Sequence, residues 1–264
     1  MSNSVLKANE IESNKITFST PKTNRFGGKL VYLNYERGPL RVQTPKMSLP
    51  FGVSKWESAP GSNSFKYLME FSFNDMVNDP KMKKFYESIR EVEDKVKSHA
   101  ELQSVSWFKK KQSREIIDEF FKSQLKHSLD GEGNITETYP PRLRSKLIHN
   151  DQDGFRVDVY DSVKNGDGEY ERLSLDKDNL EDVVPRGSKT VAILECTGIW
   201  FVEKSFGVSW KVVQVKVYKS ATKLSGCCLD DEDDEVEEEE VFEEETDKVV
   251  EVKRKSMKKK VEEE

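Results

Sequence analysis

The acidic run at residues 230–247 is the feature that most constrains how this chain can fold. Fourteen of its eighteen side chains are carboxylates, none is basic, and Phe242 is its one aromatic residue. Carboxylates at this density cannot be packed into an apolar core, and charge blocks of this kind are typical of disordered interaction tails. The sequence therefore predicts a folded part followed by a disordered acidic tail over 221–264. This tail ends in a basic cluster, KRKSMKKK, and a few further residues.

The charge of the folded part becomes visible once the tail is set aside. The chain carries a formal charge of −6, to which the acidic run contributes −14 and residues 248–264 contribute +3, which leaves +5 for residues 1–229. A flexible polyanionic tail could compete with nucleic acid for a basic groove, or it could bind basic partner proteins. A tail that only solubilises the protein is the alternative. The terminal basic cluster could be a nuclear import signal or could bind the acidic run.

Several classes of protein do not fit the sequence. The three cysteines, Cys196, Cys227 and Cys228, are too few for a disulfide framework or a zinc site. The first residues lack the apolar stretch of a signal peptide, and the longest apolar run, Thr190 to Val202, is too short to cross a bilayer. We therefore expect an intracellular protein with no membrane segment.

An enzyme is also not expected. The three histidines are scattered and have no clustered acids or cysteines beside them, and no phosphate-binding loop or hydrolase motif occurs. We therefore expect no catalytic residues, no metal and no cofactor.

Periodicity predicts strands, then two helices, then strands again. Helices are expected over 80–98, with Asp79 as N-cap, and over about 113–128. Strands are expected over 29–35, 40–44, 65–73, 154–161, 188–204 and 209–219. This order predicts a mainly β, α+β domain over 26–220, with a barrel or sandwich core and a helical insertion at about 79–129. Residues 1–25 are expected to be flexible.

The last predicted strand carries an unusual outward face. Val213, Val215 and Val217 alternate with a second set that includes Val212 and four residues able to contact nucleic acid, Trp210, Gln214, Lys216 and Tyr218. Arg156 and Tyr160 alternate in the same way on an earlier strand. Exposed rings with interleaved cations suit single-stranded nucleic acid, because bases stack on the rings and cations follow the phosphates. The alternative is an amphipathic edge strand whose Trp and Tyr cover a neighbouring helix.

A second candidate surface is the acid-free stretch between Glu36 and Glu57. It contains Arg37, Arg41, Lys46, Lys55 and Trp56. Twenty residues without an acid indicate a local positive surface. The alternative is a structural loop in which Met47 and Phe51 fill the core.

Two further basic segments can be interpreted either as phosphate-binding or as structural. One is Trp107-Phe108-Lys109-Lys110-Lys111, and the other comprises Arg142, Arg144 and Lys146. Each could bind phosphate or could be structural.

The organisation and two motifs carry a resemblance. The motifs LRVQTPKMSLPFGVS at 40–54 and WKVVQVKVYK at 210–219 resemble the single-stranded DNA-binding proteins of nucleocytoplasmic large DNA viruses, which are similar to the phage-type replicative proteins. The resemblance implies an OB-fold-like five-stranded barrel that coats single-stranded DNA in replication and recombination. It also implies that the acidic tail recruits a polymerase or primase-helicase and supports a homodimer. The phage-type tail ends in an aromatic residue, whereas this chain ends in three glutamates.

The sequence thus predicts a non-enzymatic, sequence-independent single-stranded DNA-binding protein of a host nucleus or a cytoplasmic viral replication site. The predicted DNA-binding residues are Arg37, Arg41, Lys46, Lys55, Trp56, Arg156, Tyr160, Trp210, Lys216 and Tyr218. The predicted partner-binding residues are Asp233, Glu239 and Phe242. The alternatives are a structural or virion protein, and an acidic-tailed, chaperone-like protein that binds proteins rather than nucleic acid.

Overall fold

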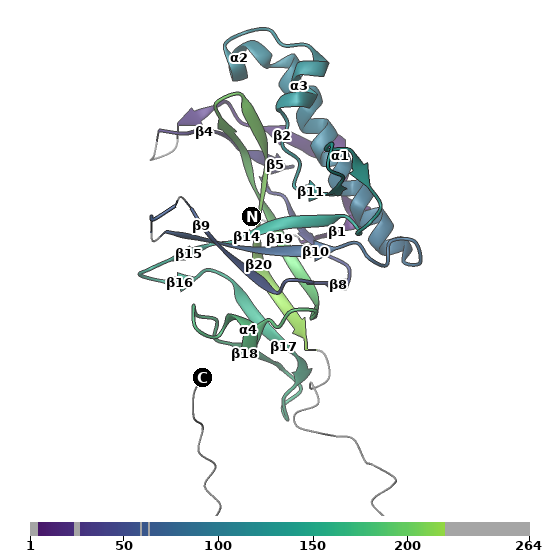
Figure 1. The fold of residues 1–264 in the computed structure, drawn as a ribbon, viewed down its shortest axis with the longest axis vertical. Coiled ribbons are helices and arrows are strands. Elements are labelled where there is room, and N and C mark those ends of the chain that lie inside the picture. Colours follow the sequence, from purple (N-terminus) through teal and green to yellow (C-terminus); the bar gives the residue numbers. More distant parts are fainter. Residues whose placement is uncertain (1–4, 24–26, 59, 63, 220–264) are drawn as a thin grey trace, which may run out of the picture. The chain divides into compact units, whose positions relative to one another are not determined.

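The computed structural model describes residues 5–23, 27–58, 60–62 and 64–219 (Figure 1). All of them belong to the first of two compact units, Met1–Lys223. The predicted acidic tail and its partner-binding residues, Asp233, Glu239 and Phe242, lie outside the described residues.

Five strands are hydrogen-bonded into a closed ring. They follow one another in the order β19 (Lys189–Val202), β8 (Met47–Ser48), β10 (Phe65–Ser72), β14 (Arg142–Leu147) and β20 (Ser205–Tyr218), and β20 pairs again with β19. The β14–β20 pair is parallel, and the other four pairs are antiparallel. The two longest strands, β19 and β20, form a hairpin that supplies two of the five strands of the ring.

Shorter strands extend the ring at its edges or form small sheets beside it. The extensions are β1 (Leu6–Lys7), β3 (Lys22–Thr23), β4 (Lys29–Val31), β7 (Arg41–Gln43), β9 (Val53–Glu57), β11 (Leu125–Lys126), β17 (Asp158–Lys164) and β18 (Tyr170–Leu173). The small sheets pair β2 (Ile16–Phe18) with β5 (Leu33–Tyr35) and β6 (Gly38–Pro39), β12 (Ser128–Leu129) with β13 (Ile135–Thr136), and β15 (His149–Asn150) with β16 (Gly154–Phe155). The predicted mainly β fold with few helices is confirmed.

The helices fall mostly between β10 and β11. They are α1 (Pro80–Leu102), α2 (Ser104–Phe108) and α3 (Arg114–Phe120), while α4 (Leu180–Val183) precedes β19 and two 3₁₀ turns, Ala8–Glu10 and Ser13–Lys15, lie near the start. Asp79 caps α1 as predicted, because its side chain accepts a hydrogen bond from the Lys81 amide at 2.8 Å. The second predicted helix is shorter than expected. The segment after Phe120 leaves the helix because Phe121 bridges to Phe206 and the Lys122 amide donates to the Phe206 carbonyl. None of the described helices has the length and apolar character needed to cross a bilayer.

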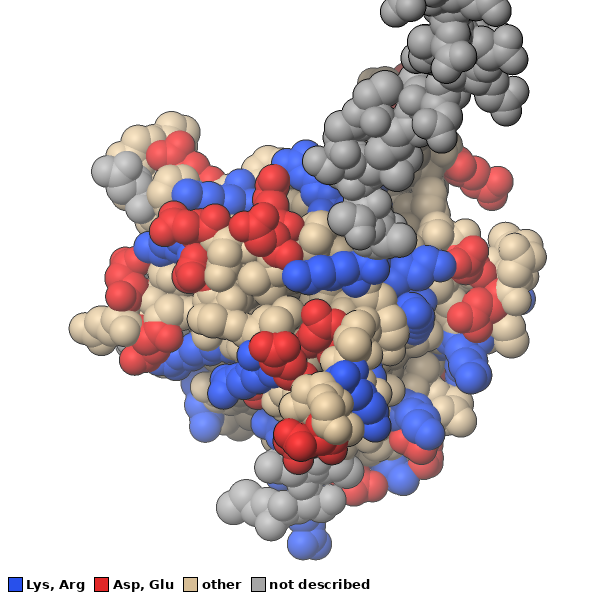
Figure 2. Space-filling model, turned by 90° about the horizontal axis from the view of Figure 1, so that it is seen from below, with Lys and Arg blue, Asp and Glu red and all other residues tan. Residues whose placement is uncertain are grey.

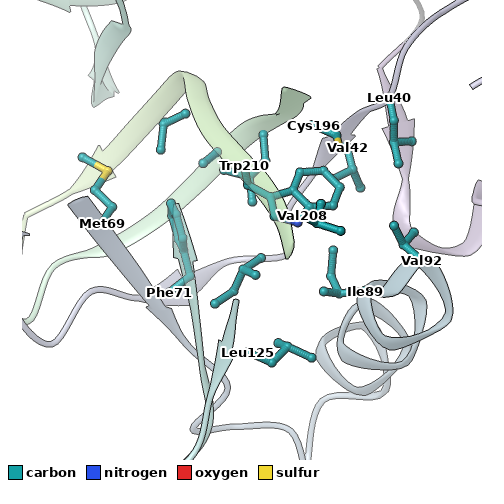
Figure 3. Packing of buried hydrophobic residues seen from close by; sticks show 14 of the residues in the cluster. Leu40, Val42, Met69, Phe71, Ile89, Val92, Leu125, Cys196, Val208 and Trp210 are labelled. Atoms are coloured by element: carbon teal, nitrogen blue, oxygen red, sulfur yellow. The ribbon is translucent and has the colours of Figure 1, made fainter. Parts of the chain in front are cut away.

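The core lies between the ring and one side of α1. Phe85, Ile89, Val92 and Val96, which set the predicted helical period, are all fully buried. Figure 3 shows Ile89 and Val92 facing Trp210 and Val208 of β20, with Met69 and Phe71 of β10 nearby. Helix α1 therefore closes one side of the ring's apolar interior.

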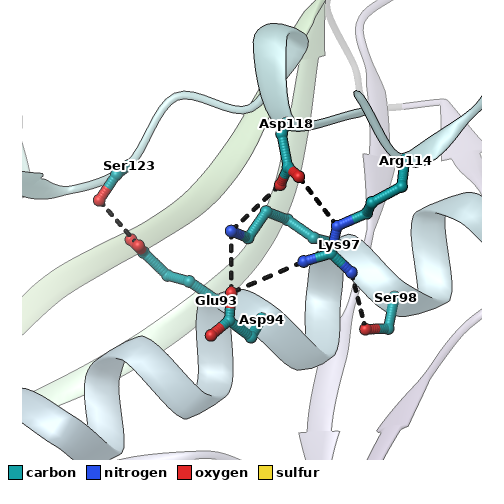
Figure 4. Close-up of polar contacts among 7 residues, drawn as sticks. All are labelled: Glu93, Asp94, Lys97, Ser98, Arg114, Asp118 and Ser123. Carbon is teal, nitrogen blue, oxygen red and sulfur yellow. Dashed lines mark hydrogen bonds and ion pairs between the residues drawn. The ribbon is translucent and has the colours of Figure 1, made fainter. Parts of the chain in front are cut away.

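A charged network joins α3 to α1 (Figure 4). Lys97 of α1 pairs with Asp94 at 2.8 Å and with Asp118 of α3 at 3.2 Å, and Arg114 of α3 pairs with Asp118 at 3.0 Å. One turn earlier on α1, Glu93 accepts a hydrogen bond from the Ser123 hydroxyl at 2.7 Å. These contacts fix the orientation of the helical insertion.

The beginning of the chain differs from the expectation of a flexible segment. Residues 5–23 contain β1, β2, β3 and the two 3₁₀ turns. Strand β1 pairs in parallel with β7, and Ile11 and Ile16 are buried in the core. The Ser88 hydroxyl of α1 also donates to the Ala8 carbonyl at 2.9 Å. The segment is polar overall, so its composition did not indicate that Ile11 and Ile16 would pack in the core.

Candidate nucleic-acid interface

Strand β9 and the loop that leads into it each present an exposed aromatic ring, Trp56 and Phe51 respectively. Trp56 is 58% exposed and Phe51 is 43% exposed. Gly52 determines where Phe51 lies. Its φ is +57°, and a Cβ added there would be 2.6 Å from the Val184 carbonyl oxygen, so the backbone passes this carbonyl more closely than other residues permit. The loop is further held by hydrogen bonds of Leu49 with Ser188 and Gly187.

The pairing of β10 with β14 places cations on the outward face of the ring. Leu143, Ser145 and Leu147 of β14 are buried, so Arg142, Arg144 and Lys146 point outward. On β10, Tyr67 and Met69 are buried and Lys66 is exposed, and Lys66 lies opposite Trp56 of β9. We call this surface the β9–β14 face. It comprises Phe51, Trp56, Lys66, Arg142, Arg144 and Lys146.

One buried carboxylate fixes the two arginines of this face. The side chain of Glu70 is 7% exposed, and its carboxylate accepts hydrogen bonds from Arg142 Nε at 2.9 Å and from Arg144 Nε at 2.7 Å. The Arg142 guanidinium also lies 5.2 Å from the centroid of the Phe51 ring. Because Glu70 neutralises one of the two guanidiniums, the pair keeps one net positive charge in a fixed geometry.

The two lysines of the face are not compensated in this way. In the described part of the chain, neither Lys66 nor Lys146 lies within ion-pair distance of a carboxylate. Desolvation of the ammonium, followed by the positive charge of Lys66, lowers the pKa of Lys146. An external anion at this point would therefore relieve a repulsion that the fold leaves in place.

Phe51, Trp56, Arg142 and Arg144 of this face, together with Lys55, line one wall of a groove of about 900 Å³. Its other wall comes from α4 and the residues around it, where Asp178, Glu181 and Asp182 line the groove beside Lys177 and Arg186. Lys177 pairs with Asp151 at 2.7 Å and Arg186 with Glu181 at 3.2 Å. The groove is thus asymmetric, with net positive charge on the strand side and acidic residues on the α4 side.

A second group of rings and cations lies around β20, β17 and β18. We call it the Tyr–Lys cluster, and it comprises Lys46, Tyr160, Tyr170, Lys216 and Tyr218. Lys46 Nζ is 3.6 Å from the Tyr218 ring centroid, and Lys216 Nζ is 4.0 Å from that of Tyr170. Tyr160, Tyr170 and Lys216 line a shallow hollow of about 380 Å³. Figure 2 views the molecule from this end and shows a row of Lys and Arg side chains bordered by Asp and Glu. The cluster holds four of the predicted DNA-binding residues.

The position of Trp210 contradicts its predicted role in DNA binding. Trp210 was predicted to be an exposed stacking residue, but it is 1% exposed and packs in the core. The reason is a β-bulge. Ile193 of β19 lies opposite Gln214 and Leu194 lies opposite Val212, so Val213 is an extra residue on β20. The bulge reverses the alternation, so that Trp210 and Val212 face inward while Gln214, Lys216 and Tyr218 face outward.

Three of the four remaining predicted residues, Arg37, Arg41 and Arg156, do not join either surface. Arg41 pairs with Glu195 at 2.6 Å. Arg156 pairs with Asp153 at 2.6 Å beside the β15–β16 hairpin. Arg37 is exposed in the turn between β5 and β6. Lys55 lies on β9 beside Trp56 and lines the same groove, although its backbone position is opposite the buried Tyr67 and its Nζ lies 4.1 Å from the Phe65 ring centroid.

The predicted DNA-binding residues did not include five residues of the β9–β14 face, although Arg142, Arg144 and Lys146 had been left open as a segment that could bind phosphate. The five are Phe51, Lys66, Arg142, Arg144 and Lys146. The signal for β14 was present, because RLRSKL alternates cations with Leu and Ser at the period of a strand. The segment contains no β-branched or aromatic residue and follows two prolines, so its composition did not indicate a strand.

Comparisons with known proteins give a limited set of similarities. A model described as a family of unknown function (DUF5871) matches residues 169–227. The uncharacterized protein L291 of Acanthamoeba polyphaga mimivirus is 26% identical over 181 residues, which is 67% of this chain and 26% of that protein. The chain therefore spans about a quarter of the length of this curated relative.

Two solved structures of phage proteins are also similar. The single-stranded DNA-binding protein of bacteriophage Enc34, in complex with single-stranded DNA, is 11% identical with a TM-score of 0.41, and the match covers 78% of this chain and 98% of that one. Protein gp2.5 of bacteriophage T7, a single-stranded DNA-binding protein, is 13% identical with a TM-score of 0.43, covering 75% and 97% respectively.

Proposed function

We propose that this protein binds single-stranded DNA without sequence preference, along the β9–β14 face. The observation that carries the proposal is the exposed Trp56 ring directly opposite Lys66, at the end of a row of outward cations on β14. A base stacked on such a ring contributes about 1–3 kcal/mol whatever its identity, and the cations follow the phosphates. Arg142 and Arg144 are oriented by Glu70, and stacking on Trp56 does not distinguish bases, so binding would not depend on sequence.

The ring of strands supports the same proposal through its topology. We infer that it is an OB-fold-like barrel, because five strands close on themselves and the third and fifth of them, β14 and β20, run parallel. Oligonucleotides bind such barrels across the second and third strands and the loops between the first and second and between the fourth and fifth strands. In this chain β10, β14 and the Phe51–Trp56 segment form the β9–β14 face, and the remaining loop is the turn between β19 and β20.

The test is a titration of the full-length chain with oligo-dT at two salt concentrations. Trp fluorescence should be quenched, and log affinity should fall with log salt by about 0.7 for each phosphate neutralised. The double variant Lys66→Glu and Lys146→Glu should bind about tenfold or more weakly and lose roughly 1.4 from the magnitude of this slope.

A matched control removes the same amount of charge elsewhere. Lys81→Glu with Lys83→Glu changes two exposed lysines of α1 and should leave the affinity and the slope nearly unchanged. Equal losses in the two variants would mean that net charge alone governs binding, and the β9–β14 face would not be the site. Absence of both quenching and salt dependence would instead favour a protein that binds proteins, such as a virion component or a chaperone.

The wider role follows from the acidic tail. We propose that residues 230–247 compete with DNA, that they recruit replication partners such as a polymerase or primase-helicase, and that the protein acts in viral DNA replication and recombination, in the host nucleus or in a cytoplasmic replication site. A homodimer is part of the same proposal. Deleting residues 230–264 should tighten binding to oligo-dT, and weaker binding after deletion would contradict the competition.

A further inference from the structure

A second groove, of about 830 Å³, lies between the helical insertion and the tip of the β19–β20 hairpin. Its floor is aromatic and is formed by Trp107 and Phe108 of α2, Phe120 of α3 and Phe201 of β19. In Figure 1 this groove belongs to the end of the unit that carries α2 and β4, whereas β9 and α4 lie at a distance from that end. It is therefore separate from the β9–β14 face.

The aromatic rings of the floor pack against one another. Trp107 meets Phe201 edge-on with a centroid distance of 5.4 Å, and Phe108 meets Phe201 at 5.8 Å. Phe108, Phe120 and Phe201 are only half-buried, so apolar surface remains uncovered in the groove. An arrangement of ring edges around a hollow suits an inserted apolar side chain better than it suits a stacked base, which needs an open ring face such as that of Trp56.

Lysines surround this floor. Lys29 donates to the carbonyl oxygens of Ser106 and Trp107, and its Nζ lies 4.7 Å from the Phe201 ring centroid. Burial, and then the charge of Lys109, lowers the pKa of Lys29. In the part of the chain that the structure describes, no carboxylate pairs with this ammonium.

The rim adds more positive than negative charge. Lys109, Lys110 and Lys204 line the groove and are exposed, and Glu119 and Glu203 are its acidic members. When Lys29 is counted, the residues that line the groove carry a net charge of +2 around its apolar floor. Its chemistry is complementary to a chain segment that presents carboxylates on either side of one large apolar side chain.

We infer that this groove docks an acidic peptide segment of a partner protein, with one aromatic side chain inserted between Phe108, Phe120 and Phe201. The carboxylates of the segment pair with Lys29 and the lysines of the rim. The inserted ring covers the apolar floor and removes water from it, which strengthens those pairs.

The test uses a synthetic peptide of residues 235–246, EVEEEEVFEEET, as a probe of the required chemistry. Binding of the labelled peptide to the full-length chain is followed by fluorescence anisotropy. The double variant Lys110→Glu and Lys204→Glu should weaken binding by about tenfold or more, whereas Lys81→Glu with Lys83→Glu should not. A peptide with Ala in place of Phe242 should bind about tenfold more weakly, and this change leaves the protein's own fold untouched.

Two results would overturn the inference. One is equal binding of the Phe and Ala peptides, which would show that charge alone attracts the peptide. The other is a loss of oligo-dT affinity in Lys110→Glu with Lys204→Glu that is as large as its loss of peptide affinity, which would make the groove part of the nucleic-acid path. Because Lys110→Glu with Lys204→Glu should leave oligo-dT affinity within about twofold, this inference and the proposed DNA-binding function fail independently of each other.

Discussion

Lys146 of β14 lies directly opposite Lys211 of β20 in the parallel pair that closes the ring. Like charges in such a position repel each other, which costs the fold some stability. Lys211 is compensated by Glu195 at 2.8 Å, but in the described residues Lys146 has no such partner. The fold thus keeps an uncompensated cation at the centre of its outward face, which is the arrangement expected where an external phosphate supplies the missing charge.

Trp56 and Trp210 should respond to DNA in opposite ways. Trp56→Ala should weaken oligo-dT binding by about 1–3 kcal/mol and remove most of the fluorescence quenching, because its ring is the exposed stacking surface. Trp210→Phe should leave both nearly unchanged, because its ring is buried. A titration of the two variants beside the wild type measures this. Quenching that survives in Trp56→Ala and disappears in Trp210→Phe would contradict the assignment.

The Tyr–Lys cluster should matter only for longer strands. If the DNA continues from the β9–β14 face to this cluster, Lys216→Glu should weaken binding of an oligo-dT of about thirty nucleotides and spare one of about six. The comparison measures affinity against length in both proteins. An equal loss at both lengths would place Lys216 within the primary contact, and no loss at either length would remove the cluster from the path.

Gly52 should be irreplaceable for two separate reasons. Gly52→Ala would add a Cβ 2.6 Å from the Val184 carbonyl oxygen at a φ of +57°, so the loop must move and carry Phe51 with it. We expect a loss of stability greater than the roughly 1–2 kcal/mol that left-handed backbone costs alone, together with weaker oligo-dT binding. Gly61→Ala is the control, because its φ is +75° but nothing lies within 4 Å. Denaturant midpoints of the two variants should differ, and equal midpoints would show that the close contact is unimportant.

Glu93 should make stability depend on pH. Burial raises the pKa of this carboxyl above its ordinary value of 4.5, although the hydrogen bonds from Ser123 and Gln124 oppose the shift. The folded state therefore binds the proton more tightly than the unfolded state, so stability falls as pH rises from about 4.5 through the raised value. Glu93→Gln removes this titration.

Urea denaturation over a pH series measures this effect. The free energy of unfolding of the wild type, relative to Glu93→Gln, should decline across that window and then level off. Glu87→Gln, an exposed change on the same helix, controls for the general effect of pH. A difference between wild type and Glu93→Gln that does not vary with pH would contradict the role of burial.

Local patterns in the sequence correctly indicated the elements that depend on neighbouring residues. Helix α1 combined an Asp79 cap, a Pro80 start and an apolar period through Phe85 and Val96, and it forms as predicted. Strands β10, β19 and β20 were likewise indicated by alternation or by long apolar runs. The mainly β class follows from the same signals.

Sequence alone determined the long strands β10, β19 and β20, the first helix and the mildly basic charge of the folded part, because these depend on near neighbours and on composition. Tertiary structure decided which side chains reach the surface. The extra residue at Val213 turns Trp210 into the core, and the pairing of β10 with β14 brings Lys66 beside Lys146 across some eighty residues of chain. Neither result has a local signal, since a bulge and a strand register are set by partners that are distant in sequence.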